Sequence, residues 1–233
     1  MTGTMYGVGL GPGAPDLVTL RSARLIGAAQ VIAYPTLAGA PSFARSIVAD
    51  LIPPGATEIA IEIPMVRERG PAQAAYDAGA ARIAEELAQG RDVVTLCEGD
   101  PFLYGSFMYL HARLAPRFRV EIVPGVTSMT AASAAARRPL AARDEVFTVL
   151  PAPLSDDALT AGIAGADSVA IMKLGRHLPK VRRVLDALGL TDRSIYVERA
   201  TLGSETVCPL AEAPEKAPYF SMILVLKGND PWL

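Results

Sequence analysis

The sequence predicts an α/β fold built from two α/β domains. Short apolar, β-branched segments alternate along the chain with segments of helical periodicity, as in sheets joined by crossover helices. Glycine-rich turns follow several apolar segments directly, which places them at the carboxyl ends of strands, where open α/β sheets bind ligands. The 233 residues are enough for one large domain or two of ordinary size.

The first predicted domain covers residues 1–138 and carries a glycine-rich loop and a Gly-Asp-Pro turn. Its first strand ends in the loop, and the helix after it begins with Pro15 and Asp16, which suit the first turn of a helix. Tyr76, Ala80, Ile83 and Leu87 predict a later helix by their spacing. In order, we expect a strand from residue 6, a helix within 14–29, strands at 31–34 and 58–63, a helix at 76–87, a strand at 93–97, a helix from 107, a strand at 119–123 and a helix at 129–136.

A break in the pattern at residues 137–140 (RRPL) marks the predicted domain boundary. The second domain, residues 139–233, is expected to be a smaller, mixed α/β unit. Gly189 is placed to end its second helix. We expect a strand at 146–150, a helix at 156–163, a strand at 168–172, a basic turn at 173–177, a helix at 181–188 and strands at 194–198 and 219–226.

The turn at residues 98–105 (EGDPFLYG) is the most informative stretch. It follows the apolar strand at 93–97 and brings a glycine, a carboxylate and a proline to its carboxyl end. Gly99 allows close backbone approach to a ligand, and Asp100 offers acceptors suited, for example, to a ribose diol. These residues alone are equally compatible with an ordinary strand-to-helix turn in which Asp100 is a cap.

A dinucleotide fold is the first alternative, because Gly9, Gly11 and Ala14 fit G-x-G-x-x-A. Pro12 lies inside the motif and removes a backbone donor from the phosphate cradle. The acidic residue expected after the second strand is also missing, since YPT stands at residues 34–36. Nicotinamide or flavin binding is therefore disfavoured.

Composition limits the other function classes. The chain is 51% hydrophobic and 20% charged, with a net charge of −2, so no global basic footprint for nucleic acid is present. Cys97 and Cys208 lack metal-ligand spacing, and we expect no metal. No apolar run reaches membrane-span length and the first residues do not resemble a signal peptide, so a cytoplasmic location without membrane association is expected.

The predicted ligand-facing corners consist of backbone, hydroxyl groups and one carboxylate. The corner after the strand at 119–123 adds Thr127 and Ser128, and no nucleophile–base, metalloprotease or phosphate-loop motif occurs. His111 lies within a helix after an aromatic run and is interpreted as a packing residue. His177 lies in a turn, where an exposed functional group is favoured slightly.

Three motifs in this order resemble the tetrapyrrole (corrin/porphyrin) methylases: GVGLGPG at 7–13, GDPFLYG at 99–105 and PGVTS at 124–128. The resemblance extends over essentially the whole chain, including YVERAT at 196–201. Within the family, CEGDP at 97–101, GSFMYL at 105–110 and MKLGRHL at 172–178 are most similar to the precorrin-2 C-20 methyltransferases of cobalamin synthesis.

The resemblance implies two α/β domains with a ligand trough between them, usually in a homodimer, and folded S-adenosylmethionine as the cofactor. Carried over by motif, the implied cofactor contacts are Pro12, Gly99, Asp100, Leu103, Thr127, Ser128, Met172 and Ala200. No catalytic residue is assigned, and we expect none of the candidate proton acceptors Glu98, Tyr104 and Glu198 to be indispensable. Candidate cations for the substrate carboxylates are Arg67, Arg69, Arg137, Arg138, Lys173 and Arg176.

The implied reaction is methylation of precorrin-2 at C-20 to give precorrin-3A. A tetrapyrrole is then the small-molecule partner, and no nucleic acid is expected. The Asp-rich segment that uroporphyrinogen methylases carry after the second strand is replaced here by YPTL at 34–37, which disfavours that substrate. The alternatives that stay open are the cobalt-containing substrate of the anaerobic route, another methylated carbon, an RNA- or protein-modifying methylase on the same fold, and a nicotinamide-dependent oxidoreductase.

Overall fold

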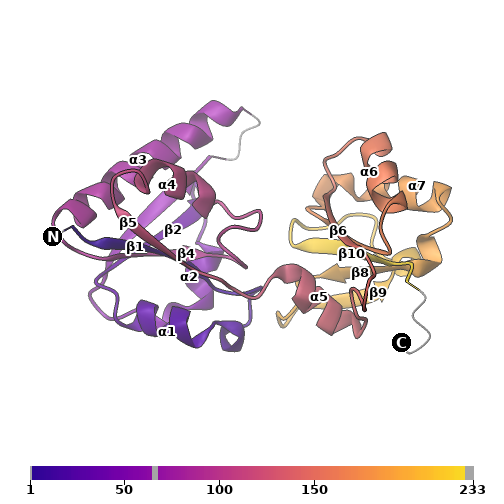
Figure 1. Ribbon diagram of the computed structural model, residues 1–233, viewed down its shortest axis with the longest axis horizontal. Coiled ribbons are helices and arrows are strands. Elements are labelled where there is room, and N and C mark those ends of the chain that lie inside the picture. The colour runs from indigo at the N-terminus through magenta and orange to yellow at the C-terminus, as the bar shows by residue number, and fades with distance from the viewer. Residues whose placement is uncertain (1, 65–67, 229–233) are drawn as a thin grey trace. The chain divides into compact units, whose positions relative to one another are not determined.

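The computed structural model describes residues 2–64 and 68–228 (Figure 1). The chain forms two compact units, Met1–Thr127 and Ser128–Leu233. The division comes before the predicted boundary at residue 138, because helix α5 (Ser128–Ala136) packs its buried Met129 and Ala132 on the sheet of the second unit. Each unit contains one sheet with helices, as the sequence predicts.

The sheet of the first unit is entirely parallel, in the order β3-β2-β4-β1-β5. Its central strand β4 is buried at every position, which explains its continuous apolar sequence. The strands are β1 (Thr4–Gly9), β2 (Val31–Leu37), β3 (Thr57–Ile63), β4 (Val93–Cys97) and β5 (Arg119–Val123).

Helices cover both faces of this sheet. On one face lie α3 (Arg69–Ala88) and α4 (Phe107–Leu114), whose buried residues form one core with strand residues such as Met5 and Val93. On the other lie α1 (Leu20–Gly27) and α2 (Phe43–Ile47), with Ile26 and Ile47 in a second core. The predicted stripe of α3 is confirmed, since Tyr76, Ala80, Ile83 and Leu87 are all buried.

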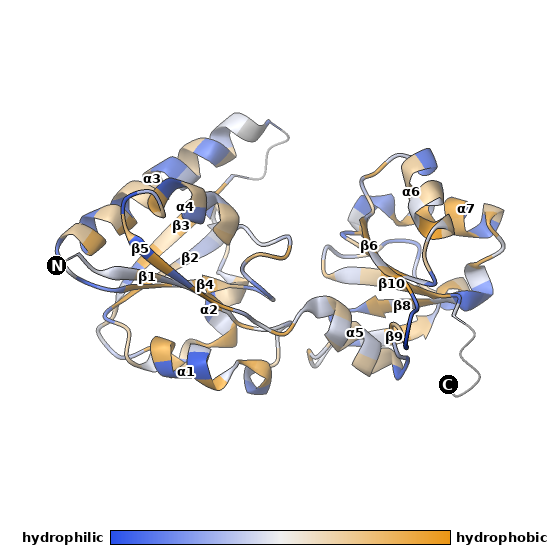
Figure 2. Cartoon of the chain, viewed as in Figure 1, coloured by the Kyte–Doolittle hydropathy of each residue, from blue (hydrophilic) through white to orange (hydrophobic). Residues whose placement is uncertain are grey.

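Local capping sets the helix ends. The Thr19 side chain accepts a hydrogen bond from the Ser22 amide at the start of α1, and Ser42 accepts one from the Arg45 amide at the start of α2. Gly90, with a φ of +81°, lies just beyond the end of α3. Figure 2 shows α1 and α3 carrying both hydrophilic and hydrophobic segments, as expected of helices with one face on a sheet.

The sheet of the second unit is mixed, with the order β6-β7-β10-β8-β9. Strand β10 runs antiparallel to both β7 and β8, so the carboxyl ends of β7 and β8 lie at the same edge as the start of β10. Strand β6 is parallel to β7, and β9 pairs antiparallel with β8. The strands are β6 (Phe147–Pro151), β7 (Ser168–Met172), β8 (Ser194–Glu198), β9 (Thr206–Pro209) and β10 (Ser221–Leu226).

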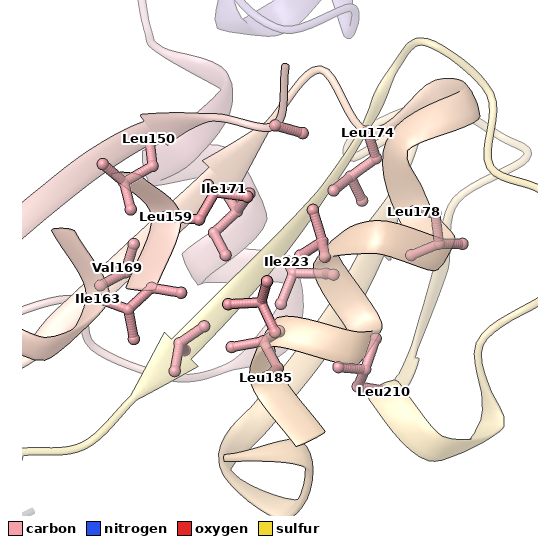
Figure 3. Packing of buried hydrophobic residues seen from close by; sticks show 14 of the residues in the cluster. Leu150, Leu159, Ile163, Val169, Ile171, Leu174, Leu178, Leu185, Leu210 and Ile223 are labelled. Atoms are coloured by element: carbon pink, nitrogen blue, oxygen red, sulfur yellow. The ribbon is translucent and has the colours of Figure 1, made fainter. Parts of the chain in front are cut away.

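The main core of the second unit lies on the other side of its sheet from α5. Leucine, isoleucine and valine side chains of the sheet meet those of α6 (Asp156–Ala164) and α7 (Leu178–Ala187), as Figure 3 shows for Ile171, Leu159 and Leu185. Ser155 caps α6 by accepting a hydrogen bond from the Ala158 amide. The second unit therefore has its own hydrophobic core, and helices pack on both faces of its sheet.

Candidate active site

Three strand-to-loop corners of the first unit meet at the carboxyl ends of β4, β1 and β5. The loop after β1 and the turn after β4 form a two-residue bridge: the Gly99 amide donates to the Gly11 carbonyl at 2.8 Å, and the Gly11 amide donates to the Gly99 carbonyl at 3.3 Å. The Leu10 amide also donates to the Cys97 carbonyl, at 2.9 Å. The glycine-rich loop and the Gly-Asp-Pro turn are thus joined through their backbones.

Asp100 joins the turn after β4 to the corner after β5. Its Oδ1 accepts a hydrogen bond from the Phe102 amide at 2.9 Å, and its Oδ2 accepts one from the Gly125 amide at 3.1 Å. The first bond closes a local turn within the loop. It is not the helix cap that the sequence left open as an alternative, because α4 begins only at Phe107, after Ser106. The second bridges two segments 25 residues apart.

Glycine is required where the corners touch. A Cβ on Gly125 would lie 2.1 Å from the Gly99 carbonyl oxygen, and one on Gly9 would lie 2.5 Å from the Gly125 nitrogen. Real Cβ atoms do not approach backbone this closely, so Gly9 and Gly125 let the three corners pack together. The motifs contain these glycines, but sequence reasoning did not assign them this contact.

Gly99 has a different environment, because its backbone has a φ of +63°. Apart from its two chain neighbours, no atom of the described residues lies within 4 Å of an added Cβ. The space beside its α-carbon is open, and the approach of a ligand there stays a prediction. Pro12 is half-buried in the neighbouring loop, and Leu103 is exposed in the turn. Thr127 and Ser128 are half-buried at the end of the β5 corner, where α5 begins. Pro12, Gly99, Asp100 and Leu103 thus come from two loops that the structure holds together.

Met172 and Ala200 belong to the second unit, and both pack against the cluster that includes Met129 and Met222. Met172 ends β7, and Ala200 follows β8, so they lie at the same edge of the second sheet. Three non-glycine residues beside them have positive φ angles: Lys173 at +60°, Arg199 at +48° and Thr201 at +73°. Such conformations cost free energy and are enriched at functional sites.

The three candidate proton acceptors have different surroundings. Both carboxylate oxygens of Glu198 are engaged, since Tyr196 Oη donates to Oε2 at 2.7 Å and Arg199 Nη1 lies 3.0 Å from Oε1. Glu98 is exposed as a residue, yet burial of its carboxyl group raises its pKa, while a hydrogen bond from the Ala44 amide acts in the opposite direction. Tyr104 is exposed and has a φ of +55°.

The candidate cations do not form one group. Lys173 and Arg176 follow the carboxyl end of β7, and Arg137 follows α5 with a φ of +53°. Arg138 instead lines a pocket of about 530 Å³ with Ser168, at the amino end of β7. Arg67 lies outside the described residues, and the side chain of Arg69, in the first turn of α3, is likewise not described.

Of the two histidine predictions, the structure supports packing for His111, whereas His177 is half-buried and not exposed as expected. The His111 ring meets the Phe102 ring edge-on, with centroids 5.1 Å apart, which fits a packing residue. His177 is half-buried, and its pKa is lowered by burial and then by the charges of Lys180 and Arg176. The described part of the chain holds no group of three His, Cys, Asp or Glu residues that could bind a metal ion. Among the same residues, no helix has the length and apolar character needed to cross a membrane.

The chain that carries these corners belongs to a known protein family. The family model of the tetrapyrrole (corrin/porphyrin) methylases matches residues 4–214, and the chain is a member of that family. It is 41% identical to a precorrin-2 C(20)-methyltransferase of Sinorhizobium sp., over 98% of this chain and 97% of that protein. It is 31% identical to the cobalt-precorrin-2 C(20)-methyltransferase of Salmonella typhimurium, over 100% and 98% of the two chains.

Solved structures show the same fold. The uroporphyrin-III C-methyl transferase of Thermus thermophilus, complexed with S-adenyl homocysteine, superposes with a TM-score of 0.70 at 23% identity. The match covers 97% of this chain and 98% of that one. The predicted α/β architecture is thereby confirmed.

Proposed function

We propose that this chain transfers a methyl group from S-adenosylmethionine to C-20 of precorrin-2, giving precorrin-3A in cobalamin biosynthesis. The observation that carries the proposal is the 41% identity, over nearly the full length of both chains, to a precorrin-2 C(20)-methyltransferase. The nicotinamide alternative is rejected, because the chain belongs to the methylase family.

The residues at the joined corners fit S-adenosylmethionine. The open face of Gly99 accepts close approach of a ligand, and the backbone bridge to Gly11 holds that face in place. We assign the cofactor contacts to Pro12, Gly99, Leu103, Thr127, Ser128, Met172 and Ala200. Asp100 belongs to the same site, but both of its carboxylate oxygens already accept from backbone amides. When bound, S-adenosylmethionine supplies a methyl group on a positively charged sulfur.

The chain's own contribution is to orient the reactants and to accept a proton. Methyl transfer to carbon depends mainly on in-line positioning in a site closed to water, which backbone corners can provide. Among the candidate acceptors, Glu98 is the one to test first, because both oxygens of Glu198 are already engaged and burial raises the pKa of Glu98. We still expect a Glu98→Gln variant to retain turnover, and loss of nearly all turnover with intact cofactor binding would contradict this.

The substrate carries several carboxylates, so basic side chains are needed to bind it. Lys173 and Arg176 are the preferred candidates, because they follow β7 directly after Met172. Arg138 is less suited, since it lies at the amino end of the same strand. An Arg176→Ala variant should raise the KM for the tetrapyrrole, and an unchanged KM would remove Arg176 from the site.

A second candidate substrate is the cobalt-containing form, because the Salmonella relative is named for cobalt-precorrin-2. The deciding experiment supplies the protein with precorrin-2, or with its cobalt form, together with isotope-labelled S-adenosylmethionine. One added methyl by mass spectrometry, placed at C-20 by carbon NMR, supports the proposal for that form. Methylation at another carbon, or no transfer to either form, refutes it.

We also propose that the protein works as a homodimer in the cytoplasm. The support for both is the resemblance to the family. Light scattering of the purified protein should give twice the chain mass of 24.5 kDa, and a mass of one chain would refute the dimer.

A further inference from the structure

Asp100 uses both of its carboxylate oxygens within the protein. Oδ1 accepts from the Phe102 amide and Oδ2 accepts from the Gly125 amide, at 2.9 Å and 3.1 Å. A carboxylate has two acceptor oxygens, one for each of the two backbone donors, whereas an amide side chain has one acceptor oxygen and an NH₂ group that only donates. The residue type is therefore matched to two donors of the protein itself.

The bond to Gly125 acts on a segment that lacks regular structure. Residues 124–127 lie between β5 and α5, and they end at Thr127, one of the assigned cofactor contacts. Gly125 is pressed against the backbone of Gly9 and Gly99, which fixes how close the corner comes. The Asp100 bond adds a directional constraint to that steric contact, because it fixes where the Gly125 amide points.

We propose that Asp100 is a positioning residue: its carboxylate holds the backbone of the β5 corner, and it supports cofactor binding through Thr127 rather than through the ribose hydroxyls. This inference rests on the proposed function. It differs from the direct contact suggested by the turn sequence, in which the carboxylate would bind the ribose diol.

The first test needs no cofactor. In the ligand-free protein, NMR follows the hydrogen exchange of the Gly125 amide in the wild type and in Asp100→Asn. An asparagine can still accept from the Phe102 amide through its Oδ1, whereas an NH₂ group in the place of Oδ2 cannot accept from the Gly125 amide. Asp92→Asn is the matched control, because Asp92 also accepts a backbone hydrogen bond, from the Thr4 amide at 2.7 Å, at the opposite edge of the same sheet.

We expect exchange of the Gly125 amide to accelerate by about tenfold or more in Asp100→Asn and to stay unchanged in Asp92→Asn. Unchanged exchange in both variants would overturn the proposal. If Asp100→Asn does not fold, the scalar coupling across the hydrogen bond between the Gly125 nitrogen and the Asp100 carboxylate carbon tests the same bond in the wild type. Absence of that coupling would also overturn it.

The second test separates positioning from direct contact. Calorimetry compares the binding of S-adenosylhomocysteine and of an analogue that lacks both ribose hydroxyls, to the wild type and to Asp100→Asn. For a positioning residue, the substitution weakens both ligands by the same factor, about tenfold. If the substitution weakens the binding of S-adenosylhomocysteine but not that of the analogue, Asp100 contacts the diol and the proposal is overturned.

The two tests also separate this inference from the proposed function. If the wild type binds no S-adenosylhomocysteine, the proposed cofactor is wrong, and the part of the inference that names Thr127 and the cofactor is overturned with it. The exchange of the Gly125 amide still decides whether Asp100 holds the corner.

Discussion

Replacing Gly125 by alanine tests whether the three corners must touch. The added Cβ would lie 2.1 Å from the Gly99 carbonyl oxygen and 2.8 Å from the Gly9 Cα. Both neighbours are backbone atoms at the ends of paired strands, so no side-chain rotation can relieve the overlap. Overpacking of this kind costs about 1–3 kcal/mol.

A corner displaced by the methyl group also loses the Asp100–Gly125 hydrogen bond, which contributes about 1 kcal/mol or more because its acceptor is charged. We therefore expect Gly125→Ala to lower the free energy of unfolding by about 3 kcal/mol, or the Tm by about 6–12 °C. Thermal unfolding by circular dichroism measures the change, and calorimetry with S-adenosylhomocysteine should show at least a tenfold loss of affinity, about 1.4 kcal/mol.

The matched control is Gly27→Ala in α1. An added Cβ there meets no atom within 4 Å, and the residue lies in a helix, where alanine should stabilise by about 0.5–1 kcal/mol. A Gly125→Ala protein that melts within about 2 °C of the wild type and binds the cofactor equally well would refute the packing argument. A comparable loss of stability and affinity in Gly27→Ala would show that the effect is not specific to the contact at Gly125.

Three further substitutions test other parts of the structure. Gly99→Ala should cost about 1–2 kcal/mol for its positive φ and weaken S-adenosylhomocysteine at least tenfold in calorimetry, because the methyl enters the open face; unchanged affinity would contradict this. Gly7→Ala places a Cβ 2.3 Å from the Phe107 ring and should lower the free energy of unfolding in urea by about 2 kcal/mol. A double variant with Phe107→Leu should recover part of that loss. Purely additive effects of the two substitutions would count against the contact. The pKa of Glu58 is lowered, mainly by its hydrogen bond with Arg45, so the stabilisation is present above the unfolded-state pKa and is lost as pH falls through the folded-state pKa. The stability gap between wild type and Glu58→Gln should be about 1 kcal/mol or less at neutral pH and should shrink as pH falls below the unfolded-state pKa of about 4.3. A gap independent of pH would refute this assignment.

Much of the fold follows from local sequence. The strands predicted at residues 93–97, 119–123, 168–172 and 194–198 are confirmed with the same bounds, because their apolar or alternating runs are bounded by glycine, proline or charged residues. Strand β9 and helix α2 were not predicted. A four-residue edge strand and a helix of little more than one turn carry too few residues for a periodic signal. The helix expected within residues 14–29 is divided into a 3₁₀ turn (Pro15–Leu17) and α1, because Thr19 caps a new start.

The candidate site was predictable only in part. The sequence placed the Gly99–Asp100 turn and the Thr127 corner at strand ends, and the family resemblance supplied their ligand. It did not predict that Asp100 would accept from Gly125, because that bond depends on strand order: β1 lies between β4 and β5, and all three carboxyl ends meet at one edge. Gly9 and Gly125 were visible in the motifs, but the reason for them is a contact between distant backbones.

Both units place residues with positive φ angles near the carboxyl ends of their strands. In the first unit, glycine occupies the positions where backbones meet, and Tyr104 in the turn after β4 keeps a side chain at a φ of +55°. In the second unit, Lys173, Arg199 and Thr201 keep side chains at positive φ angles, each at a cost of about 1–2 kcal/mol that glycine would avoid. Two of the three are cationic, which is the charge that an anionic tetrapyrrole requires. This argument favours Lys173 over Arg138 as a side chain that binds the substrate, whereas Arg199 already pairs with Glu198 at 3.0 Å.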